Sequence, residues 1–405
     1  MSSIVDRFMR YIAIDTQSDG NSTSSPSTSK QFRLARLLAE EMTEMGVSGV
    51  KLDDHHCYVY GEIPANREGD IPSVGFLAHM DTSPDAPGDA SNARIHRDYD
   101  GGVIRLSDSA SLDPEIYPEL REYKGCDLIV TDGVSLLGAD DKAGIAEIMT
   151  MAERFINDPS IPHGRIGIAF TPDEEIGRGA NYFDVEGFGM DYAYTVDGGA
   201  IGEIQYDNFN AAEARIHVKG RNIHPGNAKD IMVNAVSIAA ELDRLLPQEE
   251  RPEYTEGYDG YYHMSSLIGT VAEADSRYII RDHSDLRFRQ KLDLMRRCVD
   301  YLNLKYGNAV ELVINEQYRN MKDLITPHMF LIDNAKAAFS ACGIEPRVIP
   351  IRGGTDGARL TYKGLPCPNI SSGGLNYHSN SEYIPVRSLE KMADVLVELA
   401  SLPAR

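Results

Sequence analysis

The sequence predicts an α/β fold, in which a mostly parallel sheet covered by helices is interrupted by a smaller, inserted α+β domain. Strand-like apolar segments alternate with helical patterns in the first half of the chain, which is typical of a parallel sheet with helices on both faces. Beyond residue 211 the order changes to β-α-β-β-α-β, the ferredoxin-like arrangement. A chain of 405 residues with 42% hydrophobic residues is long enough for two to three domains. We therefore predict a first domain in two parts, residues 1–210 and 319–405, and an inserted domain over residues 211–318.

The first half begins with two helical patterns. Apolar residues recur at helical spacing in residues 3–14 and again in residues 32–46. Between them lies a polar, Ser-rich stretch, residues 15–31, which predicts an exposed loop. The segments that follow are the strand-like VGFLA at 74–78, the helical KAGIAEIMTMAERFI at 142–156, and the strand-like IGIAF at 166–170 and YAYTV at 192–196.

The inserted domain shows strand alternation and helical periodicity in turn. Its expected elements are a strand at 212–220, a helix at 233–246, strands at 263–274 and 276–283, a helix at 286–307 and a strand at 309–317. Residues 328–402 then return to alternating helices and strands, and we expect them to complete the first sheet.

The composition excludes several classes of function. Lys and Arg number 40 and Asp and Glu number 62, so the net charge of −22 repels phosphate backbones and anionic lipids. We therefore expect neither nucleic acid nor membrane as a partner. The N-terminus lacks the features of a signal peptide, and no apolar run is long enough to span a bilayer, which predicts a cytoplasmic location.

The cysteines limit the kind of metal site that this chain can build. There are five, they are scattered and none is spaced CxxC, which argues against a disulfide framework and against a thiolate zinc site. Any metal must therefore be held by histidines and carboxylates.

Acidic residues and histidines follow the predicted strands, where the functional residues of open α/β sheets lie. His79 and Asp81 follow the first strand, Glu174 and Glu175 follow the second, and Asp197 follows the third. Singly, each has an ordinary structural explanation, such as a hydrogen-bonded pair or a polar turn.

Two further groups belong with them. Asp140 precedes a predicted helix, where it could be only a helix cap, and His378 lies in a late loop. Several carboxylates gathered at one sheet edge need cations to neutralise them, so the combination predicts a metal centre. The candidate ligands are two imidazoles and three carboxylates, which suit zinc, manganese or cobalt. They are too many for one catalytic ion, so we expect two ions. These ligands are His79, Asp140, Glu175, Asp197 and His378.

The remaining two acids then acquire roles. Asp81 lies two residues after His79 and is placed to accept the outer imidazole proton. Glu174, adjacent to a candidate ligand, is placed to take a proton from water and deliver it to a leaving amine.

The motifs together resemble those of a known family. The chain contains HMDT, GADDKAG, TPDEEIGRG, VDGG, HPGNAK and RGGTDG, with YIAIDTQSD near its start and NYHSNSEYIP near its end. In this combination it is similar to the M20 family of dinuclear zinc peptidases, and the resemblance runs from end to end.

The resemblance implies a division of labour among the candidate residues. Asp140 is expected to bridge two Zn²⁺ ions, for which Co²⁺ or Mn²⁺ are possible substitutes. His79 and Asp197 then complete one site, and His378 and Glu175 complete the other.

The same resemblance implies that Asp81 and Glu174 are the two catalytic carboxylates. It also implies a cis peptide bond between Asp140 and Asp141.

The end-to-end resemblance implies an aminopeptidase that releases the N-terminal residue of tripeptides. An M20-like carboxypeptidase, dipeptidase or N-acyl amino acid deacylase would share the same metal centre and is the alternative. A catalytically inactive, metal-stabilised binding protein is a third hypothesis, but the presence of Glu174 and Asp81 counts against it.

Two residues outside the metal centre are candidates for substrate binding. Arg352, in a Gly-rich segment, is placed to bind the peptide carboxylate, or else to form a structural ion pair. His224 resembles the histidine of the family's lid domain that reaches toward the substrate carbonyl. By the same resemblance, the inserted domain is expected to act as a mobile lid. A homodimer formed through this lid is a further possibility that the resemblance implies.

Overall fold

The computed structural model describes residues 3–404, and its chain folds into two compact units. Of the described residues, 3–206, 324–349 and 355–404 make up the larger unit, and 207–323 and 350–354 make up the smaller unit. These limits lie a few residues from 210/211 and 318/319, the boundaries that the sequence predicts. Residues 350–354, which we expected in the larger unit, join the smaller one, because the Ile351 N–H donates to the Asp207 carbonyl (2.8 Å).

The larger unit is built around an eight-stranded mixed sheet with a parallel centre. Strands β8, β3, β9 and β16 run parallel to one another, whereas β1 pairs antiparallel with β2, β2 with β8, and β10 with β16. The edge strand β15 is parallel to β10. In sheet order the strands are β1 (Ser48–Leu52), β2 (Val59–Ile63), β8 (Ile166–Thr171), β3 (Val74–His79), β9 (Tyr192–Gly198), β16 (Asn369–Ser371), β10 (Glu203–Gln205) and β15 (Arg347–Val348).

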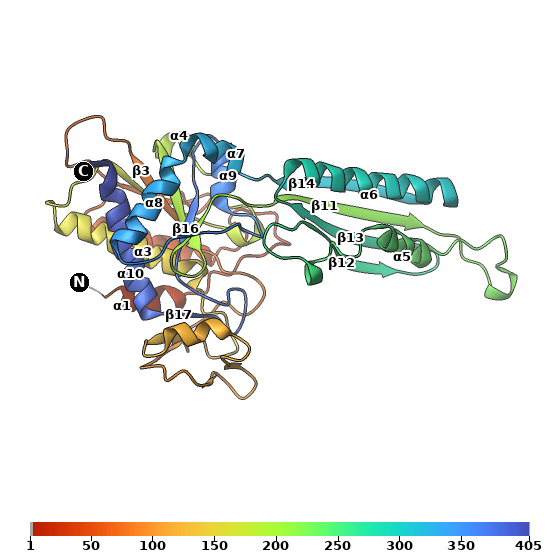
Figure 1. The fold of residues 1–405 in the computed structure, drawn as a ribbon, viewed down its shortest axis with the longest axis horizontal. Coiled ribbons are helices and arrows are strands. Elements are labelled where there is room, and N and C mark those ends of the chain that lie inside the picture. Colours follow the sequence, from red (N-terminus) through yellow and green to blue (C-terminus); the bar gives the residue numbers. More distant parts are fainter. Residues whose placement is uncertain (1–2, 405) are drawn as a thin grey trace. The chain divides into compact units, whose positions relative to one another are not determined.

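Helices cover this sheet, as the uninterrupted apolar strands require. Every residue of β3 and β8 is buried, which is possible only where both faces of the sheet are covered. Helix α3 packs on β3 and β9, and α1 and α10 pack on α3 (Figure 1). The helices of this unit are α1 (Ile4–Ile12), α2 (Gln31–Met45), α3 (Ala139–Asn157), α4 (Val185–Phe188), α8 (Phe330–Ala341), α9 (Asp356–Tyr362) and α10 (Val386–Ser401), while α7 (Lys322–Ile325) joins the two units.

Two small sheets complete the larger unit. One is three-stranded, with β7 between β17 and β4, and the other pairs β5 with β6. Their bounds are β4 (Arg94–His96), β5 (Ile104–Arg105), β6 (Ser111–Leu112), β7 (Leu128–Val130) and β17 (Tyr383–Pro385).

The smaller unit has the predicted β-α-β-β-α-β order. Its four strands form one antiparallel sheet, in the order β12-β13-β11-β14, and helices α5 and α6 pack along it (Figure 1). Apolar side chains of the two helices and of alternate strand positions make up its core. The elements are β11 (Asn210–Lys219), α5 (Ala235–Leu245), β12 (Tyr261–Gly269), β13 (Glu273–Asp282), α6 (Asp285–Tyr306) and β14 (Val310–Tyr318). The predicted α/β fold class is thus confirmed.

One expectation for the larger unit is wrong. The Ser-rich stretch 15–31 is not simply an exposed loop, since Ser18, Ser27 and Gln31 are buried. Each of the three donates a side-chain hydrogen bond within the unit, which makes its burial possible although the stretch is polar in composition. Among residues 3–404, no helix combines the length and apolar character needed to cross a membrane.

Candidate metal centre

The parallel strands bring several predicted site residues to one edge of the large sheet. His79 is the last residue of β3, and Asp197 lies near the end of the neighbouring β9. Glu174 and Glu175 form a short 3₁₀ turn, Glu174–Ile176, that follows β8. All of these strands run in the same direction, so their carboxyl ends meet at the same edge.

Asp140 lies between two imidazoles. Its Oδ1 is 2.8 Å from Nε2 of His79, and its Oδ2 is 3.3 Å from Nε2 of His378. His79 Nε2 is also 3.4 Å from Asp197 Oδ1, and His378 Nε2 is 2.9 Å from Glu175 Oε2. The structure therefore gathers all five candidate ligands into two groups, one around each imidazole, with Asp140 in common.

Asp140 owes its position to the start of α3. Asp140 and Asp141 have non-helical backbone angles, and the peptide bond that joins them is cis, as the family resemblance implied. Regular helix follows them, and the Gly138 that precedes this pair has a positive φ of 79°, which glycine adopts without strain.

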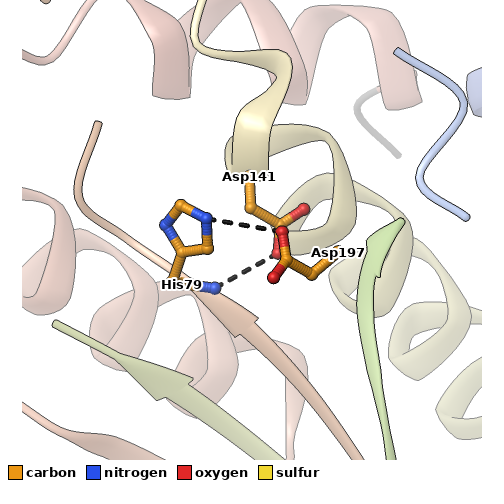
Figure 2. Close-up of side chains that lie close together, drawn as sticks. All are labelled: His79, Asp141 and Asp197. Atoms are coloured by element: carbon orange, nitrogen blue, oxygen red, sulfur yellow. Dashed lines mark hydrogen bonds and ion pairs between the residues drawn. The ribbon is translucent and has the colours of Figure 1, made fainter. Parts of the chain in front are cut away.

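Sequence reasoning did not single out Asp141 as a member of the cluster. Its carboxylate lies with His79 and Asp197, in a group whose ligand atoms are all within 4.8 Å of one another (Figure 2). Asp141 Oδ2 accepts the backbone N–H of His79 (3.2 Å), which ties the start of α3 to the end of β3. The adjacent acids Asp140 and Asp141 are visible in the sequence, but the sequence does not indicate which of the two carboxylates faces His79, Asp197 or His378.

The donor set fits divalent cations. The two imidazoles and the carboxylates Asp140, Glu175 and Asp197 are ligands that zinc accepts, and thiolates are absent from the cluster. Buried Oε1 of Glu175 and buried Oδ1 of Asp141 have no hydrogen-bond partner among the described residues. Buried carboxylate oxygens without partners are costly unless a cation or a proton satisfies them.

The electrostatics of the cluster indicate that protons and cations compete for it. Burial, together with nearby carboxylates, raises the pKa of Glu175 to about 7 and that of Asp197 to about 6. Hydrogen bonds to Asp140 and Glu175 raise the pKa of His378 to about 11. Burial raises the pKa of Asp140, but hydrogen bonds from both imidazoles outweigh it and leave the pKa below its usual value. Metal ligands must lose such protons before they bind an ion.

Glu174 and Asp81 lie beside the ligands, and Asp81 is placed differently from what we expected. The Nδ1 of His79 is nearer to the backbone carbonyl of Asp81 (2.9 Å) than to its carboxylate (3.5 Å). That carboxylate instead accepts the backbone N–H groups of Glu174 (2.9 Å) and Glu175 (3.2 Å). Burial, and next the charge of Asp197, raises the pKa of Glu174 well above its ordinary value.

Two acidic residues that sequence reasoning missed support the cluster. Buried Glu382 accepts the backbone N–H groups of Leu137, Gly138 and Asp140 at 2.8, 2.9 and 3.1 Å, so it fixes the turn that presents Asp140. Asp85 Oδ2 lies 3.2 Å from Nδ1 of His378, a contact that can orient this imidazole. Asp85 lies six residues after His79, and Glu382 lies four residues after His378. The sequence alone does not indicate which acids of these loops turn toward the cluster.

The two candidate substrate residues belong to the smaller unit. His224 is exposed, and its Nδ1 accepts the backbone N–H of Gly226 (3.1 Å). The Arg352 guanidinium donates through Nη1 to the carbonyls of Gly257 (2.9 Å) and Asp259 (3.0 Å), and through Nη2 to Thr255 Oγ1 (3.0 Å). Arg352 therefore holds the loop at residues 255–259 in this structure.

Comparison with known proteins identifies the family. Residues 132–402, more than half of the chain, match the model of peptidase family M20/M25/M40. The chain belongs to this peptidase family. It is accordingly a hydrolase of peptide bonds.

Relatives within the M20 family are similar over their whole length. The chain is 51% identical to Peptidase T of Clostridium acetobutylicum over 407 aligned positions, which cover 100% of both proteins. Its fold is similar to that of aminopeptidase PepT from Bacillus cereus ATCC 10987, with a TM-score of 0.79, 24% identity and coverage of 99% and 98%. A tripeptidase from Staphylococcus aureus has a TM-score of 0.80 at 22% identity, with the same coverage. The M20 peptidase fold, including an inserted smaller unit, is thus shared along the full chain.

Proposed function

We propose that this M20 peptidase is a dinuclear zinc aminopeptidase that releases the N-terminal residue from tripeptides. The position of Asp140 carries the metal part of the proposal, because its two carboxylate oxygens face two different imidazoles. A carboxylate in that position can serve two ions at once. The substrate class is supported by end-to-end similarity to proteins named Peptidase T.

The residues divide into two ligand sets that share Asp140. His79 and Asp197 form one set, and His378 and Glu175 form the other. Zinc ions held there would polarise the scissile carbonyl and make water a stronger acid. Cobalt or manganese suits the same ligands, since both bind imidazole and carboxylate.

Glu174 is the proposed general base and acid. It follows β8 directly and sits next to Glu175, within the cluster, while its backbone is held by Asp81. A carboxylate whose pKa is raised by burial is a stronger base than an ordinary carboxylate, which suits a group that takes a proton from water and gives it to the leaving amine. In this proposal Asp81 positions the base and orients His79.

The smaller unit is proposed to supply substrate contacts. We assign His224 to the developing oxyanion and Arg352 to the C-terminal carboxylate of the peptide. We further propose a cytoplasmic location. We also predict a homodimer formed through the smaller unit, which sedimentation at several protein concentrations can check.

One experiment tests the substrate assignment directly. The zinc-loaded protein is incubated with a dipeptide, a tripeptide and a tetrapeptide of one residue type and with an N-acetylated tripeptide, and the products are identified by mass. We expect the tripeptide to lose its first residue fastest and the acetylated tripeptide to stay intact. Efficient hydrolysis of the acetylated tripeptide would instead indicate a deacylase or a carboxypeptidase.

A further inference from the structure

The Ser-rich segment, residues 15–31, contacts two of the loops that carry site residues: the loop after His79 and the turn that contains Glu174 and Glu175. At its first end, the Gln17 side chain donates through Nε2 to the carbonyls of Ser83 (3.1 Å) and Ala86 (2.8 Å). The backbone N–H of Ser18 donates to the carbonyl of Thr82 (3.1 Å). This end is therefore attached to the loop that follows His79 and Asp81.

At its other end, the segment binds the carboxylate of Asp173. Ser27 donates its backbone N–H to Oδ2 (2.7 Å) and its hydroxyl to Oδ1 (2.5 Å), and Gln31 donates through Nε2 to Oδ1 (2.7 Å). Asp173 and Gln31 are 0% exposed and Ser27 is 7% exposed, so these donors replace water for a buried carboxylate. The partners are 142 and 146 residues apart in sequence, so the interaction is tertiary.

Asp173 immediately precedes Glu174, and the backbone conformation of Asp173 sets the direction of the turn at residues 174–176. It has a φ of 58° and a ψ of 24°, the left-handed region that Asp, Asn and Gly tolerate best. The turn continues with the Arg178 N–H donating to the Asp173 carbonyl (2.9 Å), while Arg178 Nη1 donates to the Ser22 carbonyl (2.6 Å). The Ser-rich segment thus also contacts the far end of the turn.

The two sides of the turn are held by different carboxylates. Asp81 accepts the N–H groups of Glu174 and Glu175, whereas Asp173 points its own side chain toward Ser27 and Gln31. A displacement of the turn's backbone at Glu174 therefore disturbs hydrogen bonds on both sides. Small displacements of a catalytic group lower the rate strongly, since proton transfer depends on its position.

We propose that Asp173, Ser27 and Gln31 are positioning residues of the peptidase, through which the Ser-rich segment holds Glu174 in its catalytic position. The inference rests on the proposed role of Glu174 as the base. None of the three is assigned contact with the substrate. Their effect is exerted on the backbone of the turn.

Gln31→Met tests the proposal with little change in side-chain volume. It removes the Nε2 donor to Asp173, and we expect kcat to fall by about tenfold or more while KM stays within about twofold. Ser24→Ala is the matched control, because the Ser24 hydroxyl donates to Pro26 within the same segment and not to Asp173. A change in KM alone, or an equal loss in the control, would overturn the proposal.

A double-mutant cycle separates positioning from general stability. Asp173→Gly keeps access to the left-handed backbone but removes the acceptor, so Gln31→Met should add little further loss of kcat in that background. Losses in kcat that multiply would mean that Gln31 acts independently of Asp173. If Asp173→Gly does not fold, the pair Ser27→Ala and Gln31→Met replaces it, with the same expectation of non-additive losses.

Amide hydrogen exchange of the zinc-loaded protein provides a readout that does not depend on activity. We expect Gln31→Met to accelerate exchange in residues 174–178, and Ser24→Ala to leave that exchange unchanged. Unchanged exchange there in Gln31→Met would overturn the proposal. A wild-type protein that cleaves no peptide would refute the proposed function, and in that case the exchange measurement still decides whether the segment holds the turn.

Discussion

The carboxylate of Asp140 faces the imidazole of His79, with Oδ1 2.8 Å from Nε2. Its second oxygen, Oδ2, lies 3.3 Å from Nε2 of His378, so each imidazole faces a different oxygen of the same carboxylate. Each imidazole has a further carboxylate beside it, Asp197 in one case and Glu175 in the other. The two ligand sets share only Asp140. A mutation of Asp140 therefore affects both sets, whereas a mutation of any other ligand affects one.

Replacement of Asp140 by Asn should lower the occupancy of both ions, whereas Glu175→Gln should chiefly lower one. The reason is that Asp140 alone belongs to both sets. Metal content per chain, measured after dialysis against zinc-free buffer, checks this. Asp394→Asn is a suitable control, because Asp394 forms a partly exposed ion pair with Arg154. Loss of a single ion in Asp140→Asn would contradict the bridging role.

Replacement of Glu174 by Gln should leave metal content and KM nearly unchanged and reduce kcat by about 10²-fold to 10⁴-fold, the range for a lost general base. Gln has the same shape but cannot take up the proton. Steady-state kinetics on a tripeptide, together with metal analysis of the same sample, provide the measurement.

Near-normal turnover in Glu174→Gln would remove Glu174 from the mechanism. Asp173 would not be its replacement, although the two are adjacent in sequence, because its carboxylate is turned to Ser27 and Gln31. A different group of the cluster would then have to accept the proton.

The sequence was sufficient to predict the fold class and the identity of the cluster members that the strands carry. Parallel strands end at one edge, so residues that follow them, such as His79 and Asp197, must lie near one another. Periodicity likewise identified the β-α-β-β-α-β unit, because each of its elements has a regular apolar pattern.

Contacts between distant loops were not predictable in the same way. Glu382 accepts N–H groups from residues more than 240 positions earlier, and Ser27 meets Asp173 across 146 positions. No periodic pattern encodes such pairs, since they depend on how irregular segments pack. The same holds for Arg352, whose segment was expected in one unit and packs in the other.

The metal-free protein should lose stability as pH rises, and metal should restore it. Burial raises the pKa of Glu175, Asp356 and Glu382 to about 7, above the values of these groups in an unfolded chain. The folded state therefore binds more protons than the unfolded state between about pH 4 and pH 7, and the free energy of unfolding falls as pH rises through that range. The pKa of His378, raised to about 11 by Asp140 and Glu175, extends the decrease to higher pH.

Divalent cations take the place of these protons at the ligands. The gain in thermal midpoint on adding zinc to the metal-free protein should consequently be larger at pH 8 than at pH 5.5. Glu175→Gln should reduce that gain, since it removes one ligand. An equal or smaller gain at pH 8 would show that protons and metal do not compete for the cluster.

Arg352 allows a prediction about peptide length. Its guanidinium donates to backbone carbonyls of the 255–259 loop, and its centre lies 5.2 Å from the ring centroid of Phe209. A substrate carboxylate is a stronger acceptor than these neutral carbonyls, because the hydrogen bond is charge-assisted. If the guanidinium exchanges a carbonyl partner for the peptide's C-terminus, Arg352→Ala should raise KM for a tripeptide far more than for its C-terminal amide, which has no carboxylate to lose.

Arg352→Lys distinguishes this role from support of the loop. Lysine keeps the charge but cannot make the paired contacts to Gly257 and Asp259, so it should retain part of the preference for the free acid while loosening the loop. The measurement is KM for both peptides in both variants, with the thermal midpoint as a gauge of folding. Equal increases in KM for acid and amide, accompanied by a lower midpoint, would mean that Arg352 only holds the 255–259 loop, and the selection of tripeptides would then have to come from other residues.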